Sequence, residues 1–113
     1  MSGTDGKLFR DYTSGSPTET ACDMLYLQTQ LASPKPDVVD QINIDDVLDI
    51  GLSNLNGQLV AVALWQGQLA GGIASPRVLR LIACIESGTS YRAAVVDKNG
   101  AQVVLRISPI KEG

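Results

Sequence analysis

The sequence predicts an α+β domain of two helices and a small antiparallel sheet that curls toward a barrel. Two Asn-Gly dipeptides, at residues 56–57 and 99–100, each stand between β-rich apolar runs, which is typical of a β-hairpin. Two segments that begin with Ser-Pro, at Ser16 and Ser75, continue with apolar residues at helical spacing. The resulting order of helix, strands, helix and hairpin is typical of an α+β protein.

A single domain is expected to follow a short N-terminal arm. With 113 residues and an apolar share of 44%, the chain is long enough for one hydrophobic core. Residues 1–15 are rich in Ser, Gly, Thr and Asp, so we expect a loose arm that is ordered only where Phe9 and Tyr12 pack. The domain itself is predicted over residues 16–110.

The first helix is predicted from Ser16 to about Ala32. Its first residues form a capping box, in which Ser16 and Glu19 satisfy N–H groups of the first turn and Pro17 suits the first helical position. Pro34 ends the segment, because proline cannot continue a helix. The residues expected along one side of this helix are Ala21, Met24, Leu25, Gln28 and Leu31.

Residues 37–51 allow two interpretations. Short helices at residues 38–39 and 47–48 would fit, and so would a strand whose apolar residues alternate over residues 48–52. We favour a strand that begins at Val47, because the first Asn-Gly follows it and is the strongest short signal for a hairpin.

A two-residue loop at this Asn-Gly fixes the register of the first hairpin. It pairs Leu52 with Ala61, Ile50 with Ala63 and Leu48 with Trp65. The other face of the second strand then carries Val60, Val62 and Leu64. Because both faces are apolar, we expect residues 59–65 to form a central strand or one covered on both faces. If the single chain leaves the second face uncovered, these three residues form a protein interface.

A turn at residues 66–68 leads to a short strand over residues 69–73 and then to the second helix. Ser75 is a favoured N-cap, and Pro76 suits the first helical position. Gly88 ends the helix, because glycine adopts the left-handed cap conformation without a steric clash. The apolar face of this helix carries Val78, Leu81, Ile82 and Ile85.

The second Asn-Gly predicts a hairpin over residues 91–107. A three-residue loop with Gly100 as the bulge residue keeps most large apolar side chains on one face, whereas a two-residue loop mixes the faces. The favoured register pairs Val95 with Val103, Ala93 with Leu105 and Tyr91 with Ile107. It also places Arg92 directly opposite Arg106, so that both are solvated or both face one anion.

Four arginines make up the predicted anion-binding surface. The N-terminus of the second helix favours anions through its unpaired N–H groups, and arginines stand beside it and on the second hairpin. Its residues are Arg77, Arg80, Arg92 and Arg106. Trp65 and Tyr91 lie on strands, and we expect both to pack in the core instead of stacking on bases.

Composition narrows the chemistry of the chain. Histidine is absent, which removes Ser-His and Cys-His nucleophilic machinery and the usual zinc and copper ligand sets. The formal charge is −3, with −6 over residues 1–50 and +3 over residues 51–113. An acidic chain is not typical of general nucleic-acid binders, although its second half is mildly basic.

An acidic run precedes the first predicted hairpin. It lacks the Asp-x-Asp-x-Asp-Gly pattern of a calcium loop, so we expect a solvated acidic face and no metal or other cofactor. Its members are Asp37, Asp40, Asp45, Asp46 and Asp49. A metal-dependent enzyme built on these carboxylates is the third and weakest hypothesis.

The expected compartment is the cytoplasm. The only cysteines, Cys22 and Cys84, do not make a disulfide framework, so free thiols are expected. No apolar run is long enough to span a membrane, and the N-terminus lacks a signal-peptide pattern.

Part of the chain resembles the second half of a HIRAN domain. The resemblance covers residues 59–107 and rests on Gln-Leu-Ala-Gly-Gly-Ile at residues 68–73, the helix that follows, and Tyr-Arg-Ala-Ala-Val at residues 91–95. It implies a small β-barrel associated with single-stranded DNA ends. The Arg-x-Pro-x-Asn-Pro-x-Asp stretch of that family would fall near residues 51–58 and is absent, so no site residue is carried over.

Two functional hypotheses follow. The first is a non-enzymatic binding module that acts through a protein partner or as a homo-oligomer, because the predicted strand is apolar on both faces and catalytic residue types are lacking. The alternative is a barrel that binds nucleic acid, single-stranded DNA or another phosphate ligand, through the four arginines. Neither hypothesis involves a membrane.

Overall fold

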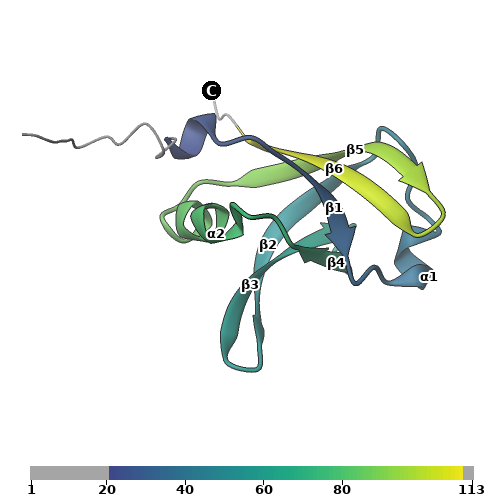
Figure 1. The fold of residues 1–113 in the computed structure, drawn as a ribbon, viewed down its shortest axis with the longest axis horizontal. Helices are drawn as coiled ribbons and strands as arrows, with labels where there is room; N and C mark the ends of the chain where they lie inside the picture. Colours follow the sequence, from purple (N-terminus) through teal and green to yellow (C-terminus); the bar gives the residue numbers. More distant parts are fainter. Residues whose placement is uncertain (1–20, 111–113) are drawn as a thin grey trace, which may run out of the picture.

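The computed structural model of the chain describes residues 21–110. Six antiparallel strands close into a barrel in the order β1-β4-β3-β2-β5-β6 (Figure 1). This confirms the predicted α+β class with a barrel-like sheet and two helices. In chain order the elements are η2 (Cys22–Met24), β1 (Leu27–Ala32), α1 (Pro36–Val39), β2 (Val47–Leu55), β3 (Gln58–Trp65), β4 (Gln68–Ile73), α2 (Val78–Glu86), β5 (Tyr91–Asn99) and β6 (Gln102–Pro109).

The first predicted helix is wrong over most of its described length, where only Cys22–Met24 form a short 3-10 helix. Its later part is β1, which closes the barrel between β4 and β6. Leu25, Leu27 and Leu31 are buried. They are separated by two and four residues, which matches the two-residue period of a strand. The capping box and the predicted arm at residues 1–15 lie outside the described residues.

The first predicted hairpin and its register are confirmed, although the ladder ends at Asp49 with Leu64 and does not include the predicted pair of Leu48 with Trp65. Leu52 pairs with Ala61 and Ile50 pairs with Ala63 in the ladder between β2 and β3. The loop residues Asn56 and Gly57 both have positive φ angles, of 54° and 81°. Such a turn has the twist that two-residue hairpins require, which is why the dipeptide predicted the register correctly.

The pairing of β4 with β3 is interrupted by a β-bulge in β4. Ala63 of β3 pairs with Gly71, but the next residue of β3, Leu64, pairs with Leu69. Close to this bulge, Gly71 lies against β1. A Cβ atom on Gly71 would stand 2.7 Å from the carbonyl oxygen of Ala32 and 2.7 Å from Cγ of Leu31. Only glycine permits this approach of two backbones, which brings β1 into the barrel.

Two helices complete the domain. The four residues of α1 confirm the short helix that was one interpretation of residues 38–39, and both of its valines are buried. Helix α2 begins at Val78, later than predicted, although Ser75 Oγ still accepts a hydrogen bond of 3.2 Å from the Arg77 N–H. Gly88 follows the helix with a φ of 110°, as the predicted stop requires.

The second hairpin has the predicted inner face but a different register. Ala93 pairs with Ile107 and Val95 with Leu105, so β6 is shifted by two residues from the prediction. The bulge lies at Val96, not at Gly100. A two-residue loop combined with a bulge inside the strand also keeps the apolar residues on one face, and the sequence pattern does not separate this solution from the predicted one.

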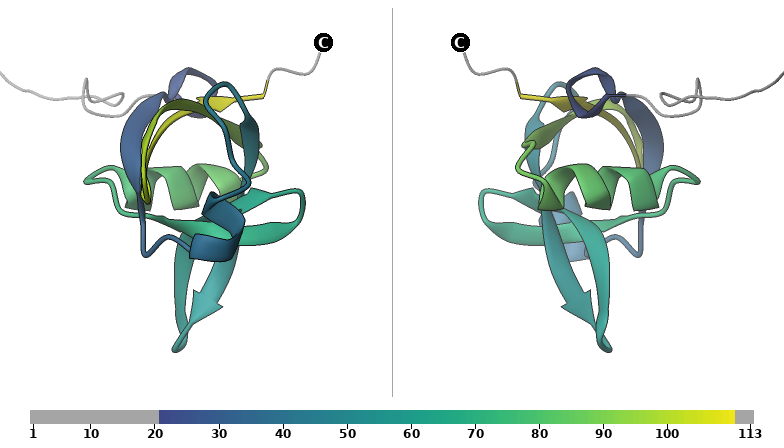
Figure 2. Two further views of the ribbon diagram at one scale, coloured as in Figure 1. Left: turned by 90° about the vertical axis from the view of Figure 1, so that its right-hand side faces the viewer. Right: turned by 90° about the vertical axis from the view of Figure 1, so that its left-hand side faces the viewer.

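The hydrophobic core fills the barrel, and α2 lies across one end of it (Figure 2). Leu81, Ile82 and Cys84 of α2 are buried in this core together with the inward residues of the strands. Tyr91 is buried and Trp65 is partly buried against the core, which confirms the packing predicted for both aromatic residues.

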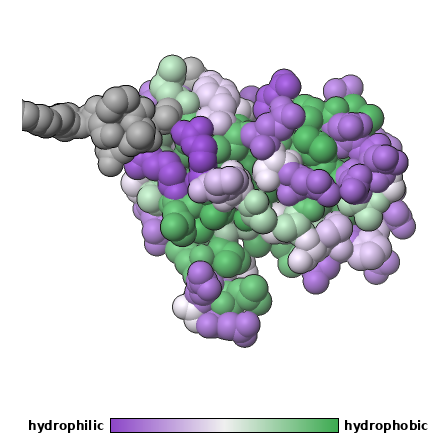
Figure 3. Space-filling view, in the orientation of Figure 1, coloured by the Kyte–Doolittle hydropathy of each residue, from purple (hydrophilic) through white to green (hydrophobic). Residues whose placement is uncertain are grey.

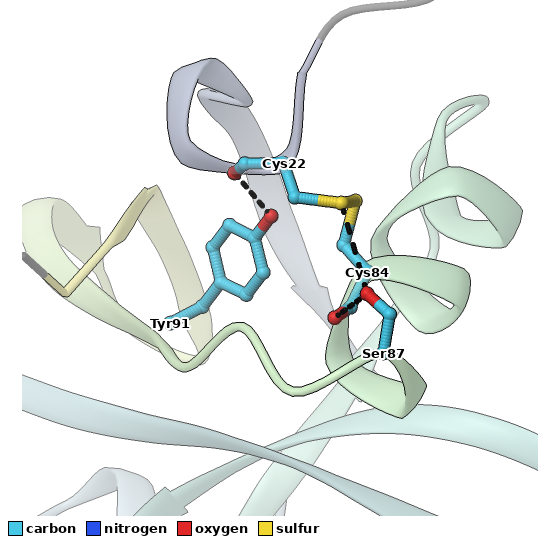
Figure 4. Close-up of a disulfide and its surroundings, with 4 residues drawn as sticks. All are labelled: Cys22, Cys84, Ser87 and Tyr91. Carbon is cyan, nitrogen blue, oxygen red and sulfur yellow. Dashed lines mark hydrogen bonds between the residues drawn. A yellow bond between two sulfur atoms is a disulfide. The ribbon is translucent and has the colours of Figure 1, made fainter.

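The two cysteines form a disulfide, contrary to the free thiols expected from the sequence. Cys22 of η2 is bonded to Cys84 of α2, with their Cα atoms 5.4 Å apart (Figure 4). A separation of 62 residues gave no local signal for this pairing. The fold of β1 decides it, because it brings the segment before the first strand over the helix.

Candidate functional site

The middle of the chain carries no charge. Residues 50–76 contain no Asp, Glu, Lys or Arg, and they form most of β2, all of β3 and all of β4. The side chains of these strands that point away from the barrel interior form one surface, here called the uncharged face. Its residues are Gly51, Ser53, Leu55, Gln58, Val60, Val62, Leu64, Leu69 and Gly72.

A groove of about 310 Å³ lies on the uncharged face. Val60, Val62 and Leu69 line one part of it, and the segment that joins β1 to α1 lines another. Lys35, in that segment, is the only charged residue in the lining. At the rim, Leu55 is 60% exposed and Leu69 is 41% exposed. The groove therefore offers an apolar binding surface with a single positive charge at its edge.

The three predicted interface residues lie together on this face. Val60 and Val62 line the groove, and Leu64 follows them along β3, opposite Asp49 of β2. Val62 is buried, whereas Val60 and Leu64 are half-buried. The space-filling view shows hydrophobic residues over the β2–β3 hairpin and hydrophilic ones at its tip (Figure 3).

The four predicted anion-binding residues are divided between two places. Arg92 and Arg106 are exposed on the outer face of β5 and β6. They are not directly opposite: Arg92 pairs with Ser108 and Arg106 with Ala94, so the two arginines are diagonal neighbours. Arg77 and Arg80 stand at the start of α2, where burial raises the pKa of the Tyr91 hydroxyl and the charge of Arg80 offsets part of that rise.

Further side chains complete the surface around Arg92 and Arg106. Asp49 is directly opposite Arg92 on β2, which offsets part of the positive charge. Gln28 is directly opposite Arg106 on β1. Tyr26 precedes β1 and is 48% exposed. Sequence reasoning missed Tyr26, because it lay inside a predicted helix. The alternation of buried Leu25 and Leu27 around it was the available signal.

The acidic run does not converge on a metal site. Within the part of the chain that the structure describes, no group of three or more His, Cys, Asp or Glu residues is arranged to hold a metal ion. Asp46 instead accepts a hydrogen bond of 2.8 Å from the Asn43 N–H, which orders the loop before β2. Of the five aspartates, only Asp46 is half-buried, and the other four are exposed.

No protein-family model, no curated protein and no solved structure matches this chain. The resemblance to the HIRAN domain therefore stays a prediction. Among the described helices, none is long and apolar enough to cross a membrane.

Proposed function

We propose that this chain is a small non-enzymatic binding module that acts through a protein partner, which includes a second copy of itself. The observation that carries the proposal is the uncharged face with its apolar groove. Charged residues are depleted at the centres of protein interfaces, and exposed apolar patches bounded by polar residues commonly mark them. The uncharged face has both properties.

The chemistry of the groove favours a polypeptide as its occupant. Its walls are aliphatic side chains and main chain, which suit the aliphatic side chains of a protein segment. The Lys35 side chain at the rim favours an acidic residue beside that segment. The groove lining lacks the aromatic and arginine side chains on which nucleic-acid bases stack.

A charge placed at the groove rim tests this proposal. In Leu69→Lys, the new ammonium would have to be desolvated on binding, so association should be lost. Val47→Lys is the matched control, because Val47 is 54% exposed and is not part of the groove lining. Self-association is measured by light scattering over a concentration series, and co-purifying proteins are quantified for each variant.

Loss of association in Leu69→Lys with retention in Val47→Lys is the expected result. Equal behaviour of the two variants, or a wild-type chain that is monomeric at high concentration and enriches no protein, would overturn the proposal.

A second candidate function is the binding of single-stranded nucleic acid at the surface of Tyr26, Arg92 and Arg106. Tyr26 is exposed and precedes Leu27, which pairs with Ile107 beside Arg106. An exposed aromatic ring together with arginines can stack a base and hold its phosphate. This candidate also accords with the function that the HIRAN resemblance implies. The carboxylate of Asp49, opposite Arg92, and the net negative charge of the chain both oppose the binding of phosphate at this surface.

Fluorescence anisotropy with a labelled oligonucleotide tests this second function. Binding should weaken steeply with salt, and Arg106→Ala should weaken it by about tenfold. Lys35→Ala removes the same charge outside the Tyr26–Arg92–Arg106 surface and should have a smaller effect. Equal losses in the two variants would show that only net charge matters and would remove this candidate.

The disulfide also bears on the compartment. Disulfides persist in oxidising compartments and are uncommon in the cytosol, so the bond between Cys22 and Cys84 favours an oxidising compartment over the predicted cytoplasm. Thiol labelling of the protein directly after cell lysis distinguishes the two. Labelled cysteines would support the cytoplasm, and unlabelled ones an oxidising compartment.

A further inference from the structure

The β2–β3 hairpin extends beyond the closed part of the barrel. Strand β2 pairs with β3 along its length to Leu55, but with β5 only from Val47 to Asp49. Among the described residues, no strand pairs with the other edge of β2 beyond Asp49. All three views show the hairpin tip projecting from the body of the barrel (Figures 1 and 2). Residues 50–55 therefore form an open strand edge.

The pairing identifies the main-chain groups on this edge. In a hairpin with a two-residue loop, the residues that close the loop are hydrogen-bonded to each other, and bonded and non-bonded pairs alternate from there. Leu55 and Gln58 close this loop. By alternation, the N–H and C=O groups of Ile50, Leu52 and Asn54 point away from β3.

This edge lacks the features that commonly prevent strands from pairing with other chains. Natural edge strands are protected by charged side chains, by proline or by a bulge. Residues 50–55 contain no charged residue and no proline, and their ladder with β3 is regular. Ser53, Asn54 and Leu55 are exposed, so the edge is accessible to another strand.

We propose that two copies of the chain associate through this edge, with β2 pairing antiparallel to β2 of the second copy about Leu52. The proposal rests on the proposed function and names its partner. It commits to a second copy because the edge is self-complementary. In the register centred on Leu52, Ile50 pairs with Asn54 and Leu52 pairs with Leu52 of the second copy. This register pairs all three residues whose N–H and C=O groups point away from β3 with such residues of the other chain.

The side chains agree with this register. Leu52 would meet Leu52 of the second copy on the inner face of the hairpin, where it already packs against the core. On the outer face, Gly51 would meet Ser53, two small residues that allow close approach. No pair in this register brings charges together, although each chain carries a net charge of −3.

The consequence of this pairing is a continuous sheet of four strands, β3-β2-β2-β3, around a two-fold axis perpendicular to the sheet. Such an axis keeps the same face of both hairpins on the same side. The uncharged faces of the two copies would then adjoin each other, with their grooves on one surface.

The test uses two substitutions at one residue. Asn54→Pro removes an outward N–H that the β2–β3 ladder does not use, and proline is tolerated at strand edges of this kind. Asn54→Ala is the matched control. Both variants lose the hydrogen bond of 2.9 Å that Asn54 Oδ1 accepts from the Gly57 N–H, but only the proline removes the edge donor.

Sedimentation equilibrium measures the dimer dissociation constant of each variant. The two-fold axis places the Asn54 N–H in the interface twice, so Asn54→Pro removes two hydrogen bonds between the copies. We expect Asn54→Pro to raise this constant by about tenfold or more, whereas Asn54→Ala stays within about threefold of wild type. Equal constants for the two variants would overturn the edge pairing.

Amide hydrogen exchange of the wild-type chain tests the pairing without any substitution. The Leu52 and Asn54 amides should exchange more slowly at high protein concentration, whereas the Leu59 amide of β3 should not change. Exchange at Leu52 that is independent of concentration would overturn the proposal. If Leu69→Lys still abolishes binding to another protein in that case, the proposed function stands and only the edge pairing fails.

Discussion

The Tyr91 hydroxyl donates a hydrogen bond of 2.6 Å to the main-chain carbonyl oxygen of Cys22 (Figure 4). Cys22 is also bonded to Cys84, and Ser87 Oγ, which donates to the Cys84 carbonyl oxygen at 2.9 Å, lies 4.0 Å from Cys22 Sγ. These contacts join η2, α2 and β5 at one end of the barrel. They hold the start of β1 in place, so the closure of the barrel should depend on them.

Tyr91→Phe tests the hydrogen bond in this cluster. The ring still packs, but the Cys22 carbonyl oxygen loses its partner, and we expect the free energy of unfolding to fall by about 1–2 kcal/mol. Urea unfolding of the oxidised protein measures the change. An unchanged midpoint would mean that water replaces the hydroxyl without cost.

The same residue predicts a loss of stability at alkaline pH. Burial raises the pKa of Tyr91 above its usual value of 10.0, and the nearby Arg80 offsets part of this shift. The folded state therefore keeps the proton more tightly than the unfolded state, and the free energy of unfolding should decrease as the pH rises above 10.0. Thermal unfolding from pH 9 to pH 11, about one unit either side of that pKa, measures the slope. Tyr91→Phe should reduce it, and an equal slope in both proteins would contradict the assignment.

Opening the disulfide should destabilise the domain strongly. The bond closes a loop with a sequence separation of 62 residues, for which loop entropy gives about 4 kcal/mol. Urea unfolding of the oxidised and reduced protein measures the difference, and Cys22→Ala with Cys84→Ala should reproduce the reduced value. A difference below about 1 kcal/mol would show that η2 remains attached to α2 without the bond.

Gly71→Ala tests the close approach of β4 and β1. The added methyl group would lie 2.7 Å from a main-chain oxygen, and backbone cannot move aside as a flexible side chain does. We expect a loss of about 1–3 kcal/mol in urea unfolding. Gly51→Ala is the control, because its methyl group would meet only Leu64 Cδ1 at 3.4 Å. Equal losses in the two variants would contradict the role given to Gly71.

Lys98→Met tests a tie between β5 and the segment around α1. The Lys98 ammonium donates hydrogen bonds to the carbonyl oxygens of Val39, at 2.9 Å, and Ile42, at 2.6 Å. Methionine keeps most of the apolar stem but leaves both acceptors unpaired, so we expect a loss of about 1.5–3 kcal/mol. Thermal unfolding measures it, and an unchanged melting temperature would show that these bonds contribute nothing.

The conformation of the loop residues explains why the register of the first hairpin was predicted correctly and that of the second was not. In the first hairpin, both loop residues had to adopt positive φ angles, and Asn56-Gly57 is suited to that geometry. In the second hairpin, two combinations of loop and bulge kept the same residues inside. The pattern therefore predicted the inner face, including Tyr91 and Val95, but not the pairing of Arg92 with Ser108.

The candidate site was predicted in part for the same reason. Alternation along β3 placed Val60, Val62 and Leu64 on one face, since that property belongs to a single strand. The groove beside them also needs the segment around Lys35, which reaches β4 through the hydrogen bond from the Lys35 N–H to the Ala70 carbonyl oxygen at 2.8 Å. No periodicity within either segment encodes that contact.

The amino-acid pattern was sufficient to predict the α+β class, the first hairpin with its register, the residues that share a face of β3, and the inward faces of β5 and β6. These depend on turn conformation and on alternation within a few residues. Three features followed from long-range packing: residues 27–32 form a strand, Cys22 meets Cys84, and the edge of β2 stays open beyond Asp49. Each of these depends on which distant segment fills the last place in the barrel, and local energies do not specify that choice.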